Sequence, residues 1–211
     1  MGFFITFEGI EGSGKSTQME MLKRYLEGRG ESVLAVREPG GTLLGEKVRG
    51  ILLNSSDEPV DPMAELFLYE ACRAQIVSSV IRPALKSGKT VICDRFTDST
   101  LAYQGYARGL DIGAIREMND RATGGLVPDL TVLIDLSPEA GLERAWARIN
   151  GKKGALEDRF EKESVLFHKK VREGYLKIAE SDPGRVRVVD GAREIPVIHG
   201  DICGIINKIN V

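Results

Sequence analysis

A glycine-rich run near the N-terminus has the residue types and the spacing that bind phosphate groups. It fits the pattern GxxxxGK[ST] and consists of Gly9, Ile10, Glu11, Gly12, Ser13, Gly14, Lys15 and Ser16. Its glycines let successive backbone N–H groups turn toward an anion, and the start of a helix adds partial positive charge. We predict that Lys15 contacts the β- and γ-phosphates of a nucleoside triphosphate and that the Ser16 hydroxyl is a ligand of Mg²⁺.

Phosphate loops occur in several classes of protein, and two features of the chain narrow the choice. GTPases carry an Asn/Thr-Lys-x-Asp motif for guanine, whereas the only similar stretch here begins at Asn207 and ends in Asn210. Mechanical ATPases usually have much longer chains with added domains, whereas this chain has 211 residues. The sequence therefore favours a small kinase that transfers phosphate to an acceptor.

Two arginines that follow other apolar stretches are candidates for binding such an acceptor. Arg37 begins the run Arg-Glu-Pro-Gly-Gly-Thr, and Arg95 is the middle residue of Asp-Arg-Phe. In an open α/β sheet both runs lie at the carboxyl ends of strands, where ligands bind. If the acceptor is itself a phosphate, two like charges about 4 Å apart repel by about 4 kcal/mol at an effective dielectric of about 20, and fixed guanidinium groups offset this repulsion. Each arginine taken alone could equally form a surface salt bridge. Asp94, at the end of the third apolar run, is expected to face Mg²⁺ or its water shell.

The elements that must position these residues alternate along the chain. Short apolar runs predict strands, and longer segments with helical periodicity separate them. This alternation is typical of an α/β fold, and we predict a doubly wound sheet of five parallel strands with about eight helices on both faces. The expected strands cover residues 3–7, 33–36, 90–93, 130–134 and 186–189. Asp61 and Ser137, each followed by proline, are expected to cap helices.

The composition indicates one globular domain over residues 1–211. The chain has 29 Lys and Arg residues against 31 Asp and Glu residues, a net charge of −2, so we expect no general affinity for nucleic acid or for a membrane. It shows neither a signal peptide nor an apolar run long enough to cross a membrane. Its three cysteines are widely spaced and lack metal-ligand spacing. We therefore expect a cytoplasmic protein with reduced thiols.

Together with the phosphate loop, several runs resemble those of bacterial thymidylate kinases, a family of nucleoside monophosphate kinases. The resemblance extends over nearly the whole chain. Its most specific parts are the run that begins at Arg37 and the stretch from Asp94 to Gly105, which contains Tyr-Gln-Gly. The other matching parts are Glu11, Tyr69, Arg73, the run Pro128-Asp129-Leu130 and the run Asp158-Arg159-Phe160-Glu161.

The resemblance implies a reaction and a set of residue roles. The reaction is transfer of the γ-phosphoryl group of ATP to dTMP with Mg²⁺, which gives dTDP and ADP. Arg37 and Arg95 are implied to bind the acceptor phosphate, and Glu11 is implied to meet the 3′-hydroxyl of the deoxyribose. The remaining implied contacts are stacking of Tyr69 on the base, donation from Arg73 to thymine O4, Ser99 and Thr100 at the base edge, Tyr103 under the sugar and Gln104 beside the base.

The segment 148–161 is expected to contain a lid. Glycines and lysines at positions 151–154 interrupt a helical pattern there, which suits a mobile lid and, from composition alone, suits a plain surface loop equally well. Because the phosphate loop is acidic at Glu11, the resemblance implies that a lid arginine meets the transferring phosphoryl group. Arg148 is the favoured residue, and Arg159 is the alternative. The resemblance also implies a homodimer formed by helices in the regions 61–79 and 111–122.

Two other functions remain open on the sequence. One is a kinase for another monophosphate, such as dUMP or CMP. The other is a nucleotide-binding regulatory module without an acceptor, which would have no need of Arg37, Arg73 and Arg95. His168 and His199 have no partners at catalytic spacing, and we expect them at the surface or as helix caps.

Overall fold

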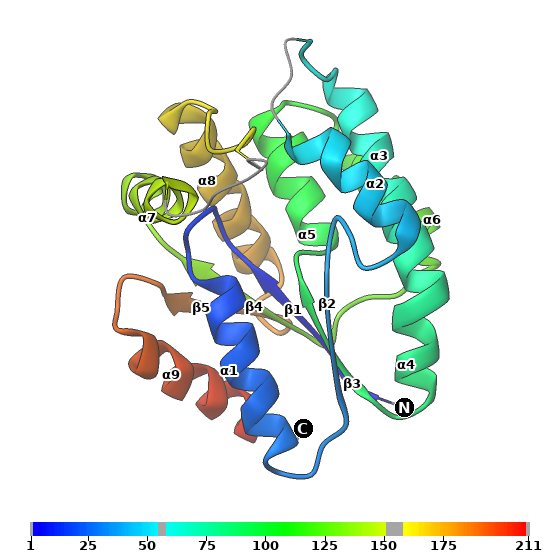
Figure 1. The fold of residues 1–211 in the computed structure, drawn as a ribbon, viewed down its shortest axis with the longest axis vertical. Helices are drawn as coiled ribbons and strands as arrows, with labels where there is room; N and C mark the ends of the chain where they lie inside the picture. The colour runs from blue at the N-terminus through cyan, green and yellow to red at the C-terminus, as the bar shows by residue number, and fades with distance from the viewer. Residues whose placement is uncertain (1, 55–57, 151–157, 210–211) are drawn as a thin grey trace.

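The structure is a computed structural model and describes residues 2–54, 58–150 and 158–209. In these residues five parallel strands form one sheet in the order β2-β3-β1-β4-β5 (Figure 1). The strands are β1 (Phe4–Glu8), β2 (Val33–Arg37), β3 (Thr90–Asp94), β4 (Leu130–Asp135) and β5 (Val186–Asp190). They confirm the expected sheet, but each strand ends one residue later than the apolar pattern predicted. That last residue is polar in every strand, so it ends the pattern while still pairing in the sheet.

Nine α-helices are present in the described part of the chain. They are α1 (Lys15–Glu27), α2 (Leu43–Leu53), α3 (Pro62–Ile76), α4 (Arg82–Lys86), α5 (Thr97–Thr100), α6 (Ile112–Thr123), α7 (Pro138–Asn150), α8 (Val165–Ser181) and α9 (Ile195–Lys208). A π-helical turn, Val77–Ile81, joins α3 to α4, and a second, Leu101–Ala107, continues α5. Counted as continuous segments, the helices agree with the expected number of about eight. Asp61 caps α3 as expected, because its side chain accepts hydrogen bonds from two backbone N–H groups at 2.8 and 3.2 Å.

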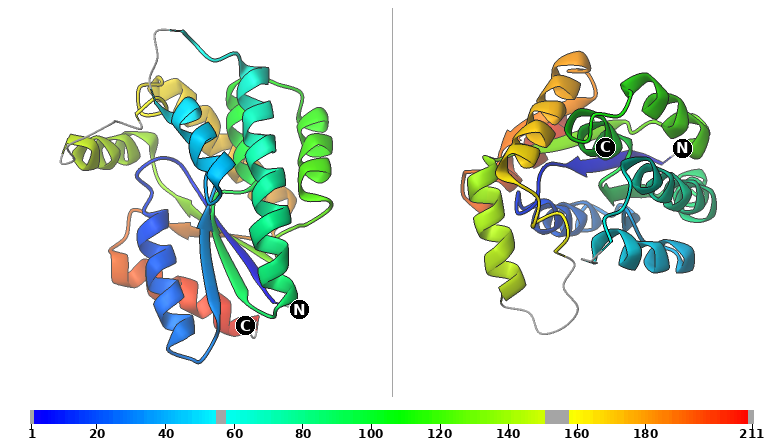
Figure 2. Two further views of the ribbon diagram at one scale, coloured as in Figure 1. Left: turned by 45° about the vertical axis from the view of Figure 1, so that its right-hand side comes forward. Right: turned by 90° about the horizontal axis from the view of Figure 1, so that it is seen from above.

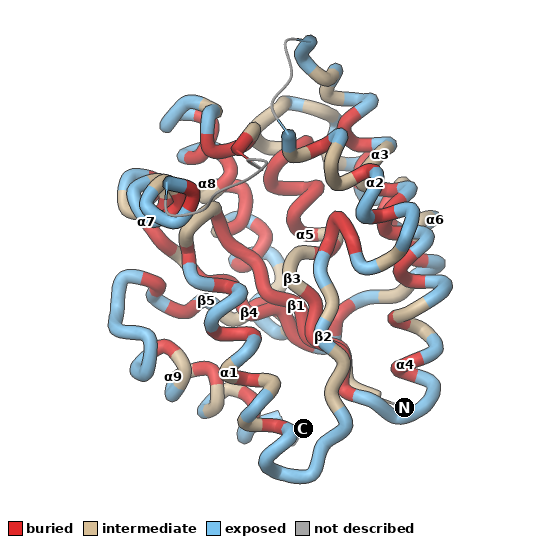
Figure 3. Tube along the Cα trace, in the orientation of Figure 1, coloured by how far each residue is buried: buried red, intermediate tan, exposed pale blue. Residues whose placement is uncertain are grey.

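Helices cover both faces of the sheet (Figure 2). Helices α1 and α9 pack on one face, and α4, α5 and α8 pack on the other. Successive residues of β1 face opposite layers: Ile5 and Phe7 belong to an apolar cluster with α1 and α9, whereas Phe4 packs with α4. Strands β1, β3 and β4 are therefore almost wholly buried (Figure 3). None of the helices in the described residues is long and apolar enough to cross a membrane.

Candidate active site

A cleft of about 980 Å³ opens where the central strands end. Most predicted site residues line it: Glu11, Gly12, Ser13, Gly14, Lys15, Ser16, Arg37, Tyr69, Asp94, Arg95, Ser99, Thr100, Tyr103, Gln104 and Arg148. The predicted residues outside the lining are Gly9, Ile10, Arg73 and Arg159. The topology brings the lining residues together, because β1, β2 and β3 are parallel neighbours and the residues that follow them meet at one edge of the sheet.

The phosphate loop joins β1 to α1 and turns at glycines. Gly12 and Gly14 have φ angles of 70° and 97°, in the left-handed region that other residues rarely adopt. Helix α1 begins at Lys15, whose Nζ donates to the carbonyl oxygens of Gly9 and Ile10 at 2.9 and 2.8 Å. Burial lowers the pKa of Lys15 to about 8, because a buried ammonium loses its hydration. The loop thus holds a cationic side chain beside the N-terminus of a helix.

Helix α7 lies directly against the phosphate loop. A Cβ atom on Gly12 would fall 2.0 Å from the carbonyl oxygen of Gly141, and a Cβ atom on Gly141 would fall 2.5 Å from the carbonyl oxygen of Glu11. Backbone therefore contacts backbone, an approach that only glycine permits. The helix that leads into the expected lid is seated on the loop.

Ser16 and Asp94 meet across the floor of the cleft. The Ser16 hydroxyl donates to Asp94 Oδ2 at 2.9 Å. Both residues offer hard oxygen ligands of the kind that Mg²⁺ prefers. Among the described residues there is no group of three His, Cys, Asp or Glu side chains that could hold a metal ion. A hydroxyl and a carboxylate suit an ion that takes its other ligands from phosphates and water.

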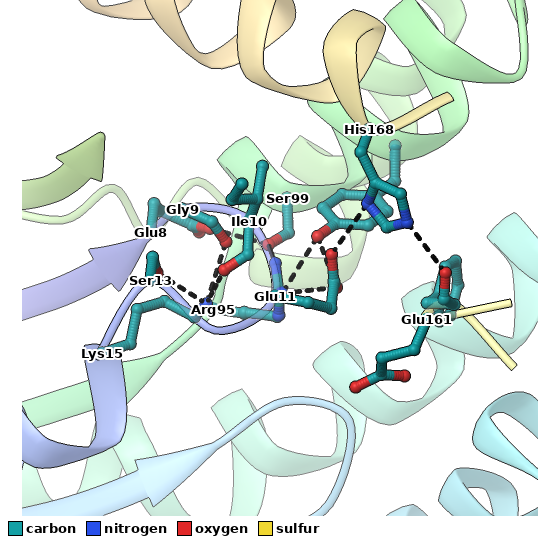
Figure 4. Close-up of polar contacts among 12 residues, drawn as sticks. Glu8, Gly9, Ile10, Glu11, Ser13, Lys15, Arg95, Ser99, Glu161 and His168 are labelled. Carbon is teal, nitrogen blue, oxygen red and sulfur yellow. Dashed lines mark hydrogen bonds and ion pairs between the residues drawn. The ribbon is translucent and has the colours of Figure 1, made fainter. Parts of the chain in front are cut away.

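Arg95 is fixed through its backbone and its side chain. Its φ of 69° is the one positive value outside glycine in the part of the chain that the structure describes. Its Nη2 donates to Glu11 Oε1 at 2.9 Å (Figure 4). The same nitrogen donates to the Tyr103 hydroxyl at 3.0 Å, and Nη1 donates to the Tyr175 hydroxyl at 3.0 Å. Such a backbone conformation costs on the order of 1–3 kcal/mol and persists where the surrounding contacts enforce it. The guanidinium is consequently held on the cleft wall in one orientation.

Beneath this turn lies a buried carboxyl group that the sequence analysis did not single out. Glu8 accepts hydrogen bonds from the backbone N–H of Phe96 and from the hydroxyls of Ser99 and Tyr175, each at 2.7 Å. Burial raises the pKa of Glu8 to about 7, and the negative charge of Asp98 adds to the shift. Glu8 ties the end of β1 to α5 and α8.

Glu11 is held by groups from three elements. Its Oε1 accepts a hydrogen bond from the Tyr103 hydroxyl at 2.6 Å as well as from Arg95, and its Oε2 lies 3.3 Å from Nδ1 of His168. Burial alone would raise the pKa of Glu11, but the Arg95 guanidinium and the contact with His168 hold it well below its usual range. Glu11 is therefore an ionised carboxylate at the cleft.

The expected surface or capping position is wrong for His168. The residue is 1% exposed and lies inside the molecule next to the site. It shares the buried face of α8 with Val171 and Tyr175, which follow it by three and seven residues. This helical spacing was the feature of the sequence that indicated a buried position for His168. His199 lies half-buried on α9, where it contacts Cys203.

Arg73 lies below the cleft and bonds to protein groups. Its Nε donates to Glu38 at 2.9 Å, and its Nη1 donates to Glu70 at 2.8 Å and to Asn119 at 2.7 Å. A longer bond of 3.2 Å reaches the Thr100 hydroxyl, which does line the cleft. Its implied contact with a base stays a prediction, since the side chain is 1% exposed in this arrangement.

The remaining implied acceptor residues lie on the cleft wall. Tyr69 comes from α3, and Gln104 comes from the π-helical turn, where its amide donates to Glu65 at 2.6 Å. Arg37, at the end of β2, is half-exposed and pairs with Glu46 at 3.1 Å. These residues lie at the cleft as the resemblance requires, and their contacts with a ligand stay predictions.

The two lid arginines lie in different places. Arg148, at the end of α7, lines the cleft, is half-exposed and lies 3.3 Å from Glu161. Arg159 instead bonds to Glu65 and to the carbonyl oxygen of Leu52. Residues 151–157 of the expected lid lie outside the described residues. The geometry is compatible with the preference for Arg148, whose role stays a prediction.

Three further arginines line the cleft without having been predicted. Arg49 donates to the carbonyl oxygen of Pro39 at 2.8 Å, and Arg144 donates to that of Gly191 at 3.0 Å. Arg193 is the third. They follow no recognisable motif, and they add positive charge to a cleft that already contains Lys15.

Comparison with known proteins gives one consistent result. The sequence model of the thymidylate kinase family matches residues 7–202. A thymidylate kinase of Citrifermentans bemidjiense is 57% identical over 92% of this chain and 87% of its own, and one of Nitratidesulfovibrio vulgaris is 54% identical over 96% of this chain and 91% of its own. The crystal structure of thymidylate kinase from Ehrlichia chaffeensis covers 97% of this chain and 98% of its own, with a TM-score of 0.77 and 35% identity. The chain therefore belongs to the thymidylate kinase family.

Proposed function

We propose that this chain transfers the γ-phosphoryl group of ATP to dTMP, giving dTDP and ADP for dTTP synthesis. The observation that carries the proposal is that one cleft contains a phosphate loop and a second set of cationic side chains. Lys15 belongs to the first set, and Arg37 and Arg95 belong to the second. A nucleotide-binding regulator needs only the first set.

The phosphate loop serves the donor. The backbone N–H groups of residues 9–16 and the N-terminus of α1 bind the phosphates of ATP. Lys15 exchanges its bonds to the carbonyl oxygens of Gly9 and Ile10 for the β- and γ-phosphates, where a fixed cation stabilises the charge that shifts during transfer.

Ser16 and Asp94 would hold Mg²⁺. Their hydroxyl and carboxylate fit this hard cation, and their 2.9 Å contact shows that both can reach one point at the cleft floor. When bound, Mg²⁺ offsets negative charge on the triphosphate.

The arginine side of the cleft serves the acceptor. Arg95 and Arg37 bind the phosphate of dTMP, and Glu11 accepts the 3′-hydroxyl. The base lies on Tyr69, with Gln104 beside it and with Ser99 and Thr100 at its edge; Tyr103 supports the sugar. Arg73 reaches thymine O4 only by exchanging a protein partner for the base, and its 3.2 Å bond to Thr100 is the longest of those partners.

The remaining parts of the proposal concern the lid arginine, the oligomeric state and the cellular compartment. Arg148 meets the transferring phosphoryl group from the lid, with Arg159 as the alternative. The chain forms a homodimer through α3 and α6, which the exposed Phe67 on α3 supports. The small-molecule partners are ATP and dTMP in the cytoplasm, and the three free cysteines suit that compartment.

A coupled assay of ADP release with a panel of monophosphates tests the function. We expect the highest kcat/KM with dTMP and lower values with dUMP, CMP and the ribonucleotide analogue of dTMP. A preference for another monophosphate would reassign the acceptor. ADP release that is independent of any acceptor would favour a regulatory ATPase.

A further inference from the structure

His168 lies between the phosphate loop and the C-terminal end of the lid segment. Its Nε2 is 3.0 Å from the carbonyl oxygen of Phe160, and its Nδ1 is 3.3 Å from Glu11 Oε2. Figure 4 shows the imidazole facing the Glu11 carboxylate. The side chain is 1% exposed, so any hydrogen-bond partner of its ring must come from the protein itself.

The two partners fix where the protons of His168 must be. A carbonyl oxygen can only accept, so Nε2 carries a hydrogen. In a neutral imidazole Nδ1 then holds a lone pair, and that lone pair faces a carboxylate oxygen that has no hydrogen either. Neither His168 Nδ1 nor Glu11 Oε2 has a hydrogen-bond partner in the described residues, and the two atoms face each other at 3.3 Å. A second proton, on Nδ1, converts this repulsion into a charge-assisted hydrogen bond.

The groups around Glu11 show which of the two residues keeps that proton. Arg95 and Tyr103 both donate to Oε1, and Lys15 adds positive charge from the phosphate loop. Glu161 is the negative group that opposes them. Two donors and a further cation stabilise the carboxylate of Glu11, so the proton belongs to the imidazole.

We propose that His168 is an imidazolium in the free protein and that it is a positioning residue for Glu11. Its Nδ1–H holds the carboxylate in place, and its Nε2–H connects the phosphate loop to the Phe160 end of the lid segment. The consequence for substrate binding rests on the proposed function, in which Glu11 accepts the 3′-hydroxyl of dTMP. Loss of the Nδ1–H donor releases Glu11 and raises the KM for dTMP.

Nitrogen-15 NMR of the free, full-length protein tests the protonation state without any activity. The chain has two histidines, so the imidazole signals that remain in a His199→Gln variant belong to His168. This substitution leaves the site untouched. We expect both ring nitrogens of His168 to carry protons. A neutral His168 with a bare Nδ1 overturns the proposal even if the protein phosphorylates dTMP, whereas an imidazolium in a protein that does not phosphorylate dTMP contradicts only the proposed function.

A pair of substitutions tests the positioning role. In His168→Asn the amide nitrogen takes the place of Nδ1 and donates to Glu11, and in His168→Gln it takes the place of Nε2 and donates to Phe160. We expect His168→Gln to raise the KM for dTMP about ten-fold, with a smaller change in the KM for ATP, because Glu11 loses a donor. His168→Asn, which keeps that donor, should have a KM for dTMP closer to that of the wild type. Equal effects of the two substitutions would mean that His168 only packs the helix.

Discussion

Lys15 is the side chain on which we expect the donor half of the reaction to depend most. Its ammonium is buried and bonded to loop carbonyls, so it is already in place when a triphosphate arrives. Lys15→Ala should lower kcat by on the order of 100-fold, because a fixed cation at developing charge is commonly worth about 3 kcal/mol. Steady-state ADP release measures this, and the control is Lys23→Ala, which changes a partly buried lysine on the same helix that pairs with Glu27. Full activity in the first variant would exclude the phosphate-loop mechanism.

Tyr103 is the residue expected to select the sugar. Its ring is buried, the Arg95 guanidinium lies over it at 4.9 Å, and its hydroxyl donates to Glu11. A ribose 2′-hydroxyl against this ring loses its hydrogen bonds to water, which costs about 1–3 kcal/mol or roughly 5- to 150-fold in kcat/KM. The wild type should therefore prefer dTMP over its ribonucleotide analogue.

Substitutions at Tyr103 separate its ring from its hydroxyl. Tyr103→Ala should narrow the ratio of kcat/KM values for the two sugars and lose some activity with dTMP. Tyr103→Phe keeps the ring and should keep the ratio, although it loses the bond to Glu11. Measuring both substrates on the three proteins decides the matter. A ratio that is unchanged in Tyr103→Ala would assign sugar choice to another residue.

Single residues were predictable where their type and spacing carry chemistry. The phosphate loop and Arg95 were found because a loop between strand and helix and a strand end are fixed points of the fold. Glu8 and Tyr175 were not found, since 167 positions separate them in the chain and only the folded sheet and α8 bring them within 2.7 Å. His168 was missed for the same reason, because its partner Glu11 is remote in sequence.

At the scale of elements, the two ends of the lid segment place two arginines in different surroundings. Arg148 is 55% exposed on the cleft and is free to change partner, whereas Arg159 is 14% exposed and pairs with buried Glu65. Arg148→Ala should lower kcat with little change in either KM, as expected of a group that acts in the transition state. Arg159→Ala should instead lower the melting temperature, since it leaves a buried carboxylate without that partner. Pre-steady-state kinetics and thermal melts on both variants distinguish the two, and the reverse pattern would exchange the assignments.

The strands were easier to predict than the helices. A buried parallel strand is a continuous apolar run, and each predicted strand was correct to within one residue at its ends. The π-helical turn Leu101–Ala107 has no comparable pattern, because it packs closely along α8 and takes its form from that contact. Tyr103 and Gln104 both lie on this turn. The directions in which their side chains point therefore could not be predicted from the local sequence.

For the whole molecule, the buried carboxyl of Glu8 makes stability depend on pH. Burial, aided by the charge of Asp98, raises its folded-state pKa from 4.5 to about 7. Between these values the folded state keeps a proton that the unfolded state has released. The free energy of unfolding should therefore fall as the pH rises from about 4.5 to about 7, by about 3 kcal/mol from this group.

Urea unfolding at about pH 5 and about pH 8 measures this contribution. The Glu8→Gln protein should lose less stability over the interval than the wild type, because glutamine has no proton to release. Glu38, whose pKa burial also raises to about 7, acts in the same direction and is present in both proteins. Because the charge of Glu8 adds to the Glu38 shift, the difference between the two proteins reports Glu8 together with its effect on Glu38. Equal losses in the two proteins would contradict the shifted pKa.

The contact of α7 with the phosphate loop has a consequence for mutational tolerance. A clash between side chains can be relieved by shortening one of them, but Gly12 and Gly141 have no side chain to shorten, and the atoms that a new Cβ would strike are carbonyl oxygens. No second substitution at either position can compensate for the first. A library that randomises both positions together, in cells whose growth depends on this kinase, tests this. The recovered clones should contain glycine at both positions. The neighbouring exposed residue Glu143 is the control and should accept many residue types.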